Sequence, residues 1–266
     1  MNSIFAGLLA LAAICGGMGV GVWLARRLPE QHLTGETGTA VSVAMAVVGT
    51  LAALVLGLMV NSANASFSAR TSAIESLAAG VIKLNRTLLN YGPVTAPIRA
   101  ELDVYVRAKA RELSQPQPAG DIGLTTLHML EDMNEKILRL PTAGPRDLHL
   151  QQRALALVEG VTDARWMLAE KTQVGMPTPF LILLVAWLSL LFANFGLFAP
   201  KNATVFTFLL LGATAIAGCI FIILELGSPT QGLIRPSAEP LIRVAEQLKL
   251  VNASLPVTAQ AGSPAR

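Results

Sequence analysis

The sequence carries unusually little charge. Only 14% of its 266 residues are charged and 5% are aromatic, whereas 53% are hydrophobic. Soluble globular proteins have about 25% charged residues. This shortage of charge excludes a purely soluble fold and predicts that much of the chain lies within a membrane.

Residue types that carry catalytic or metal chemistry are also scarce. The two cysteines, Cys15 and Cys219, lie inside apolar stretches, where they are expected to act as small buried side chains. The three histidines stand in separate segments and lack the spacing of metal ligands. No phosphate-binding loop, nucleophile motif or CxxC pair is present. We therefore expect no enzymatic activity, no catalytic residue, no metal site and no cofactor.

Positive and negative residues are nearly equal in number in the region outside the apolar stretches, which argues against a nucleic-acid partner. The net charge is +3, and between residues 64 and 172 thirteen lysines and arginines accompany twelve aspartates and glutamates. Binding to a phosphate backbone requires a patch of one sign of charge. We therefore expect that the protein binds no nucleic acid.

Four uncharged apolar stretches are each long enough to cross a bilayer, which requires about 20 helical residues. They cover residues 4–25, 40–60, 177–198 and 204–224. The first stretch has no basic residue before it and no small-residue cleavage site after it, so we expect a retained span rather than a signal peptide. Only five residues separate the last two stretches, which predicts a tight antiparallel hairpin.

The region between the second and third stretches has apolar residues at helical spacing. Glycine or proline at 92–93, 116–118 and 141–145 divides it into four amphipathic helices. A further helix is expected over 238–251, followed by a disordered end. The sequence thus predicts an all-α integral membrane protein with four transmembrane helices, two plus two, and a helical soluble domain inserted between spans two and three.

The expected domain boundaries follow from these segments. They are 1–63 for the first transmembrane pair, 64–172 for the soluble domain, 173–226 for the second pair, and 227–266 for the C-terminal helix and tail. An even number of spans places both termini and the soluble domain on one side of the membrane. Three basic residues flank the spans on the loop side and four on the other, so the positive-inside rule does not decide the orientation.

The second span carries a stripe of small and polar side chains on one helical face. Its members follow one another mostly at steps of three or four residues: Ala46, Gly49, Thr50, Ala53, Gly57, Asn61 and Asn64. Small residues allow two helices to pack closely. They also line narrow pores when several copies of a helix surround an axis. The stripe is therefore either a helix-packing face or a pore lining.

The other spans contain a few residues of note. Gly17 and Gly21 form a GxxxG pair in the first span, which permits close helix packing. Asn194 lies near the end of the third span, where an amide is expected to bond a neighbouring helix or to belong to an ion pathway. Glu225 directly follows the fourth span and is either an acid at the membrane interface or part of an ion pathway.

Four segments of the chain carry a resemblance to a known family. They are residues 27–33 (RLPEQHL), 50–60 (TLAALVLGLMV), 189–205 (SLLFANFGLFAPKNATV) and 220–235 (IFIILELGSPTQGLIR). These segments resemble a widespread bacterial membrane family of unknown function that is labelled bestrophin-like, and the hairpin at 196–204 is the most specific of them. The family pattern has an aspartate at position 227 and an aromatic residue at 230, whereas this chain has Gly227 and Thr230.

The resemblance implies the plan of the bestrophin anion channels, which have two spans, a helical cytosolic segment, two spans and a cytosolic tail. These channels assemble as pentamers with the second span lining the pore. For this chain the resemblance implies a bacterial inner-membrane location, a cytoplasmic soluble domain and cytoplasmic termini. The acidic cluster that binds calcium in animal bestrophins has no counterpart here, since only Glu225 and Glu239 lie nearby.

We therefore expect a homo-oligomer in the lipid bilayer that conducts small anions. The alternative is a non-conducting membrane scaffold or signalling protein. In that case the stripe would pack against a neighbouring helix, and the soluble domain would bind another protein.

Overall fold

A computed structural model describes residues 3–114, 124–173, 178–200, 202–227 and 236–253. All regular secondary structure in these ranges is helical, which confirms the predicted all-α class. The helices form two units, each with a hydrophobic core. The apolar unit comprises residues 1–67 and 175–234, and the helical bundle comprises residues 68–174 and 235–266.

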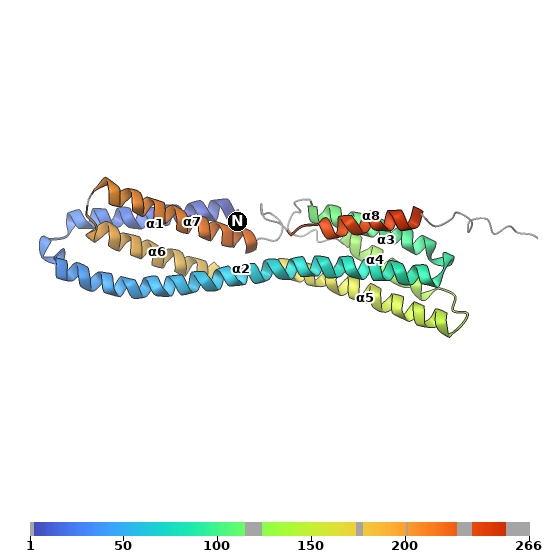
Figure 1. The fold of residues 1–266 in the computed structure, drawn as a ribbon. Coiled ribbons are helices and arrows are strands. Elements are labelled where there is room, and N and C mark those ends of the chain that lie inside the picture. Colours follow the sequence, from blue (N-terminus) through green and yellow to red (C-terminus); the bar gives the residue numbers. More distant parts are fainter. Residues whose placement is uncertain (1–2, 115–123, 174–177, 201, 228–235, 254–266) are drawn as a thin grey trace, which may run out of the picture. The chain divides into compact units, whose positions relative to one another are not determined.

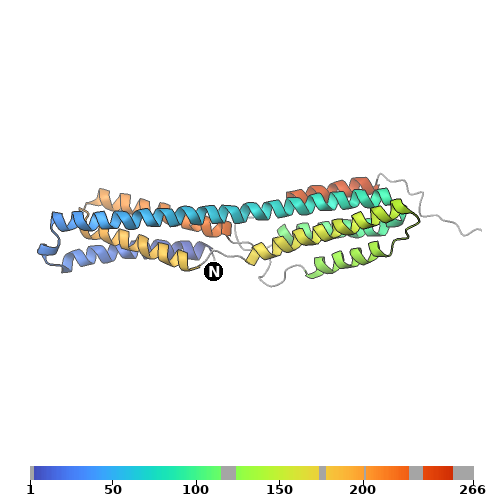
Figure 2. The same ribbon diagram turned by 90° about the horizontal axis from the view of Figure 1, so that it is seen from below.

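The apolar unit contains α1 (Ser3–Arg27), α6 (Thr178–Phe198), α7 (Ala203–Gly227) and the first part of α2 (Gly35–Tyr91). These helices lie side by side (Figure 1 and Figure 2), and each is long and apolar enough to cross a membrane. Ile14, Leu184 and Ile220 belong to their shared core, whereas Phe208 is 69% exposed. Helices that are apolar on their outer surfaces as well as in their core are suited to a lipid environment.

Helices α1 and α6 approach each other unusually closely. A Cβ atom added to Gly17 would lie 2.3 Å from the carbonyl oxygen of Ser189. A Cβ atom added to Gly21 would lie 2.0 Å from the carbonyl oxygen of Ala193, and Gly196 makes the reciprocal approach from α6 to α1. No side chain fits at such distances, so glycine is required for this contact. The contacting residue numbers rise together, so the two helices run parallel.

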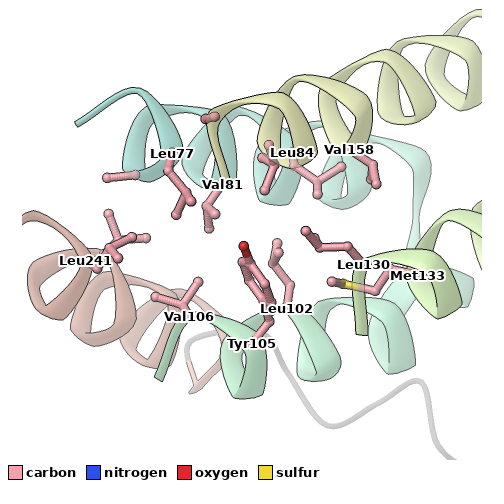
Figure 3. Packing of buried hydrophobic residues seen from close by; sticks show 14 of the residues in the cluster. Leu77, Val81, Leu84, Leu102, Tyr105, Val106, Leu130, Met133, Val158 and Leu241 are labelled. Atoms are coloured by element: carbon pink, nitrogen blue, oxygen red, sulfur yellow. The ribbon is translucent and has the colours of Figure 1, made fainter. Parts of the chain in front are cut away.

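The helical bundle consists of α3 (Ala96–Ser114), α4 (Leu124–Leu138), α5 (Pro145–Gln173), α8 (Glu239–Ala253) and the second part of α2. Each helix turns an apolar stripe toward a common core, which Figure 3 shows from close by. Leu77 of α2, Leu102 of α3, Met133 of α4, Val158 of α5 and Leu241 of α8 are all buried there. Burial of these stripes against one another stabilises the bundle.

The chain reverses where α2 ends. Gly92 has a φ of 127°, a conformation that favours glycine. The short 3₁₀ helix η2 (Pro93–Thr95) follows. The Thr95 hydroxyl donates a hydrogen bond of 2.7 Å to the carbonyl of Leu88, which also accepts one of 3.4 Å from the backbone N–H of Gly92 at the end of α2. The break predicted at 92–93 is therefore the turn between α2 and α3.

Helix α2 is continuous from the apolar stretch into the bundle. It begins at Gly35 and ends at Tyr91, and the boundary between the two units falls after Phe67, compared with the predicted boundary after residue 63. A second short 3₁₀ helix, η1 (Glu30–His32), precedes it. The predicted break at 116–118, Thr230 and the end of the chain after 253 lie outside the described residues.

Candidate functional site on helix α2

The stripe of small residues on α2 faces away from the other helices of the apolar unit over most of its length. Six of its seven residues are exposed, and Gly49 is half-buried. A Cβ atom added to Gly49 would lie 3.7 Å from the side chain of Leu191 on α6. A Cβ atom added to Gly57 would have no heavy atom within 4 Å among the described residues. The helices of one chain therefore leave most of the stripe uncovered.

A different face of α2 packs inside the apolar unit. Ala52, Met59 and Ala63 are 3%, 5% and 1% exposed and belong to its hydrophobic core. A third face carries large apolar side chains, among them Leu54 and Leu58, each 61% exposed. In a membrane, a face of large apolar side chains is suited to lipid. The stripe is thus distinct both from the packed face and from the face of large apolar side chains.

The polar groups of the stripe differ in how they are satisfied. The Thr50 hydroxyl donates a hydrogen bond of 2.9 Å to the carbonyl of Ala46, one turn earlier in the same helix. This internal bond lets Thr50 face an apolar neighbour at little cost. The amides of Asn61 and Asn64 lie on exposed positions beyond the apolar part of the span. They are available to water, to ions or to a second protein.

The two candidate residues predicted in and after the later spans, Asn194 and Glu225, are enclosed by protein. Asn194 is 8% exposed, and its Oδ1 atom has no hydrogen-bond partner among the residues that the structure describes. Glu225, near the end of α7, is 2% exposed. Neither residue belongs to the stripe of α2. The structure therefore presents the stripe as an outer surface and these two side chains as interior groups.

A family model for the bestrophin-like domain matches residues 12–241. The chain belongs to the bestrophin-like family. The match extends from within α1 to the beginning of α8 and so includes most of α1, the other apolar helices and most of the bundle. No curated protein and no solved structure matches the chain.

This bestrophin-like chain also buries basic side chains in its bundle, which the sequence interpretation missed. Arg70, Arg99, Lys109 and Arg165 are each no more than 6% exposed. Lys109 Nζ lies 2.7 Å from Glu112, whose second oxygen accepts a hydrogen bond of 3.3 Å from Thr126. The only signal in the sequence was the position of Lys109 beside the apolar stripe of α3, and a basic residue there can equally extend to solvent.

Burial shifts the pKa values of several groups in the bundle, among them Lys109 and Tyr105. It lowers the pKa of Lys109, a shift that the hydrogen bond to Glu112 opposes and the nearby charge of Arg165 reinforces. Burial also raises the pKa of Tyr105, whose hydroxyl has no hydrogen-bond partner among the described residues. In the bestrophin-like chain, then, the titratable groups with marked shifts lie in the bundle and not on the stripe.

Acidic, cysteine and histidine side chains do not gather in the described part of the chain. Within the described ranges, no group of three or more of them is placed to hold a metal ion. The stripe itself contains no titratable residue. The stripe therefore consists of small side chains and neutral polar groups. Such a surface suits close contact between helices or the passage of small solutes.

Proposed function

We propose that this membrane protein is a homo-oligomeric ion channel that conducts small anions, with the stripe of α2 facing the axis shared by the subunits. The observation that carries the proposal is the exposure of the stripe. Small and polar residues occupy a surface that the chain's own helices leave open. A symmetric oligomer would bring copies of this surface together around its axis.

The composition of the three faces of α2 supports this placement. If the stripe faced lipid, the amides of Asn61 and Asn64 would find no hydrogen-bond partners there. The glycines, which have no side chains, would leave the helix backbone poorly covered by apolar atoms. At a shared axis, Gly57 and Ala53 would set the width, while Thr50 and the two amides would contact water or ions. Membership of the bestrophin-like family and the order of its helices agree with this arrangement. In this proposal the protein lies in the bacterial inner membrane, and its helical bundle lies in the cytoplasm.

Current measurements on the purified protein in planar bilayers test the proposal. We expect a chloride-dependent current from the wild type and a lower single-channel conductance in Ala53→Leu and Gly57→Leu, because each substitution narrows the axis. Ala44→Leu is the matched control. It adds the same bulk as Ala53→Leu at an exposed position of the same helix, outside the stripe, and should leave conductance unchanged.

The alternative scaffold function predicts a different pattern. If the stripe packs against a helix of another subunit or partner, Ala53→Leu should reduce the size of the assembly in detergent, because the backbones can no longer approach. A wild-type protein that passes no current at any voltage, in an assembly without an axial opening, would contradict the channel proposal and leave the scaffold.

A further inference from the structure

A pocket of about 300 Å³ lies in the apolar unit, where α1 and α6 end and α7 begins. Its walls are mainly apolar and come from all three helices. The principal side chains around it are Met18, Val22, Arg26, Phe195, Phe206 and Leu209. Phe195 and Phe206 are 44% and 50% exposed, so the pocket is reached from outside the unit.

The charge that the described residues contribute to the pocket is positive. Among the described residues that line it, Arg26 is the only charged one, and no acidic side chain is present. Asn202 also contributes to the lining, but its Oδ1 accepts a hydrogen bond of 2.9 Å from the backbone N–H of Val205 and so caps α7. A ligand of this pocket would therefore place negative charge at Arg26 and apolar groups against the remaining walls.

The position of the pocket along the helices indicates which ligand meets both conditions. The apolar runs of α1 and α6 end beside it, and the apolar run of α7 begins there. The ends of membrane-spanning helices lie at the level of the lipid headgroups. At this level, phospholipids present phosphate groups directly above their acyl chains. The other arginine at the end of α1, Arg27, is not part of the lining and lies 5.5 Å from the ring centre of Trp23.

We propose that this pocket binds a phospholipid with an anionic headgroup. The phosphate pairs with the guanidinium of Arg26, and an acyl chain lies along Met18, Val22 and Leu209. The arginine gives preference for a net negative headgroup over a zwitterionic one, because its positive charge lies near the membrane surface and meets no acidic side chain among the described residues of the lining. This proposal does not depend on ion conduction, so it stands or falls separately from the channel.

Native mass spectrometry of the full-length protein tests it. The protein is held in detergent micelles that contain equal amounts of phosphatidylglycerol and phosphatidylcholine, and the retained lipid is counted. We expect the wild type to retain phosphatidylglycerol preferentially and Arg26→Gln to lose this preference about fivefold. Arg27→Gln is the matched control, since it removes the same charge one residue away, and it should behave like the wild type.

A second variant tests the volume of the pocket rather than its charge. Ala199→Phe places an aromatic ring in the pocket from the end of α6, and we expect it to reduce retention of both lipids. Size-exclusion profiles and melting temperatures that match the wild type would show that the variants are folded.

Several results would overturn the proposal. Equal retention by the wild type and Arg26→Gln would remove the role of the arginine, and equal losses in Arg26→Gln and Arg27→Gln would indicate general surface attraction. Displacement of phosphatidylglycerol by inorganic phosphate, but not by sodium chloride of equal ionic strength, would assign the pocket to free phosphate. Absence of retained lipid in the wild type, with a smaller assembly in Ala199→Phe, would make the pocket a contact between subunits.

Discussion

At the scale of single residues, the two tyrosines of the bundle differ in the hydrogen bonding of their hydroxyl groups, and this difference can be tested. Tyr105 is fully buried, and its hydroxyl has no hydrogen-bond partner in the described part of the chain. The Tyr91 hydroxyl, in contrast, donates a hydrogen bond of 2.6 Å to the carbonyl of Pro141. A buried polar group without a partner costs stability, whereas a formed hydrogen bond contributes about 1 kcal/mol.

We therefore predict opposite effects of the same chemical change. Tyr105→Phe should raise the free energy of unfolding by about 1 kcal/mol, and Tyr91→Phe should lower it by about 1 kcal/mol. The apparent melting temperature of the full chain in detergent measures both. A loss of stability in Tyr105→Phe comparable to that in Tyr91→Phe would show that the buried hydroxyl is satisfied.

The burial of Tyr105 also predicts that alkaline pH lowers the stability of the protein. Burial raises the pKa of Tyr105 above its usual value of 10, so the folded state keeps a proton that the unfolded state releases above about pH 10. Stability should fall as the pH rises through this range, and part of this fall should be absent in Tyr105→Phe. Melting temperatures of both proteins between pH 8 and pH 11 measure the difference. Parallel curves would contradict the assignment.

Asn61 permits a residue-scale test of the channel. On the proposed function its amide faces the permeating ions, so Asn61→Asp should shift the reversal potential in a potassium chloride gradient toward that of a cation-selective pore. Ser62→Asp is the control, because it adds the same charge at the next exposed residue, about 100° around the helix. An equal shift in both variants would indicate a general surface potential instead of a residue at the axis.

At the scale of elements, the contact between α1 and α6 depends on the absence of side chains. The GxxxG pair predicted only that close packing was permitted, and the structure places both glycines against the backbone of α6. The sequence could not name the partner, because Gly17 and Ser189 are far apart along the chain. The partner residues Ser189, Ala193 and Gly196 are themselves small.

We predict that Gly21→Ala destabilises the apolar unit by about 1–3 kcal/mol, since its Cβ atom would lie 2.0 Å from the carbonyl oxygen of Ala193. Gly19→Ala is the matched control in the same helix, because its Cβ atom would have no neighbour within 4 Å among the described residues. Melting temperatures in detergent compare the two variants. Equal stability of both would show that the helices can separate without cost.

At the scale of the whole molecule, the proposed orientation places the bundle in the cytoplasm. Thr142 lies exposed between α4 and α5, and His32 lies exposed between α1 and α2. In a protein whose Cys15 and Cys219 are replaced by alanine, an impermeant thiol reagent applied to intact cells should label His32→Cys. It should label Thr142→Cys only after the cells are opened. Labelling of Thr142→Cys from outside would reverse the orientation.

The sequence by itself determined that this is a helical membrane protein of the bestrophin-like family and where most of its helices begin and end. The helical membrane class follows from local features, namely the length of apolar runs, helical periodicity and breaks at glycine and proline. The family follows from the resemblance of four short segments, above all the hairpin at 196–204. The tertiary structure alone decided which face of α2 is buried, that α6 is the partner of the first span, and that Lys109 and Asn194 lie inside. Periodicity identifies residues that share a face, but only the packing of distant segments determines what that face contacts.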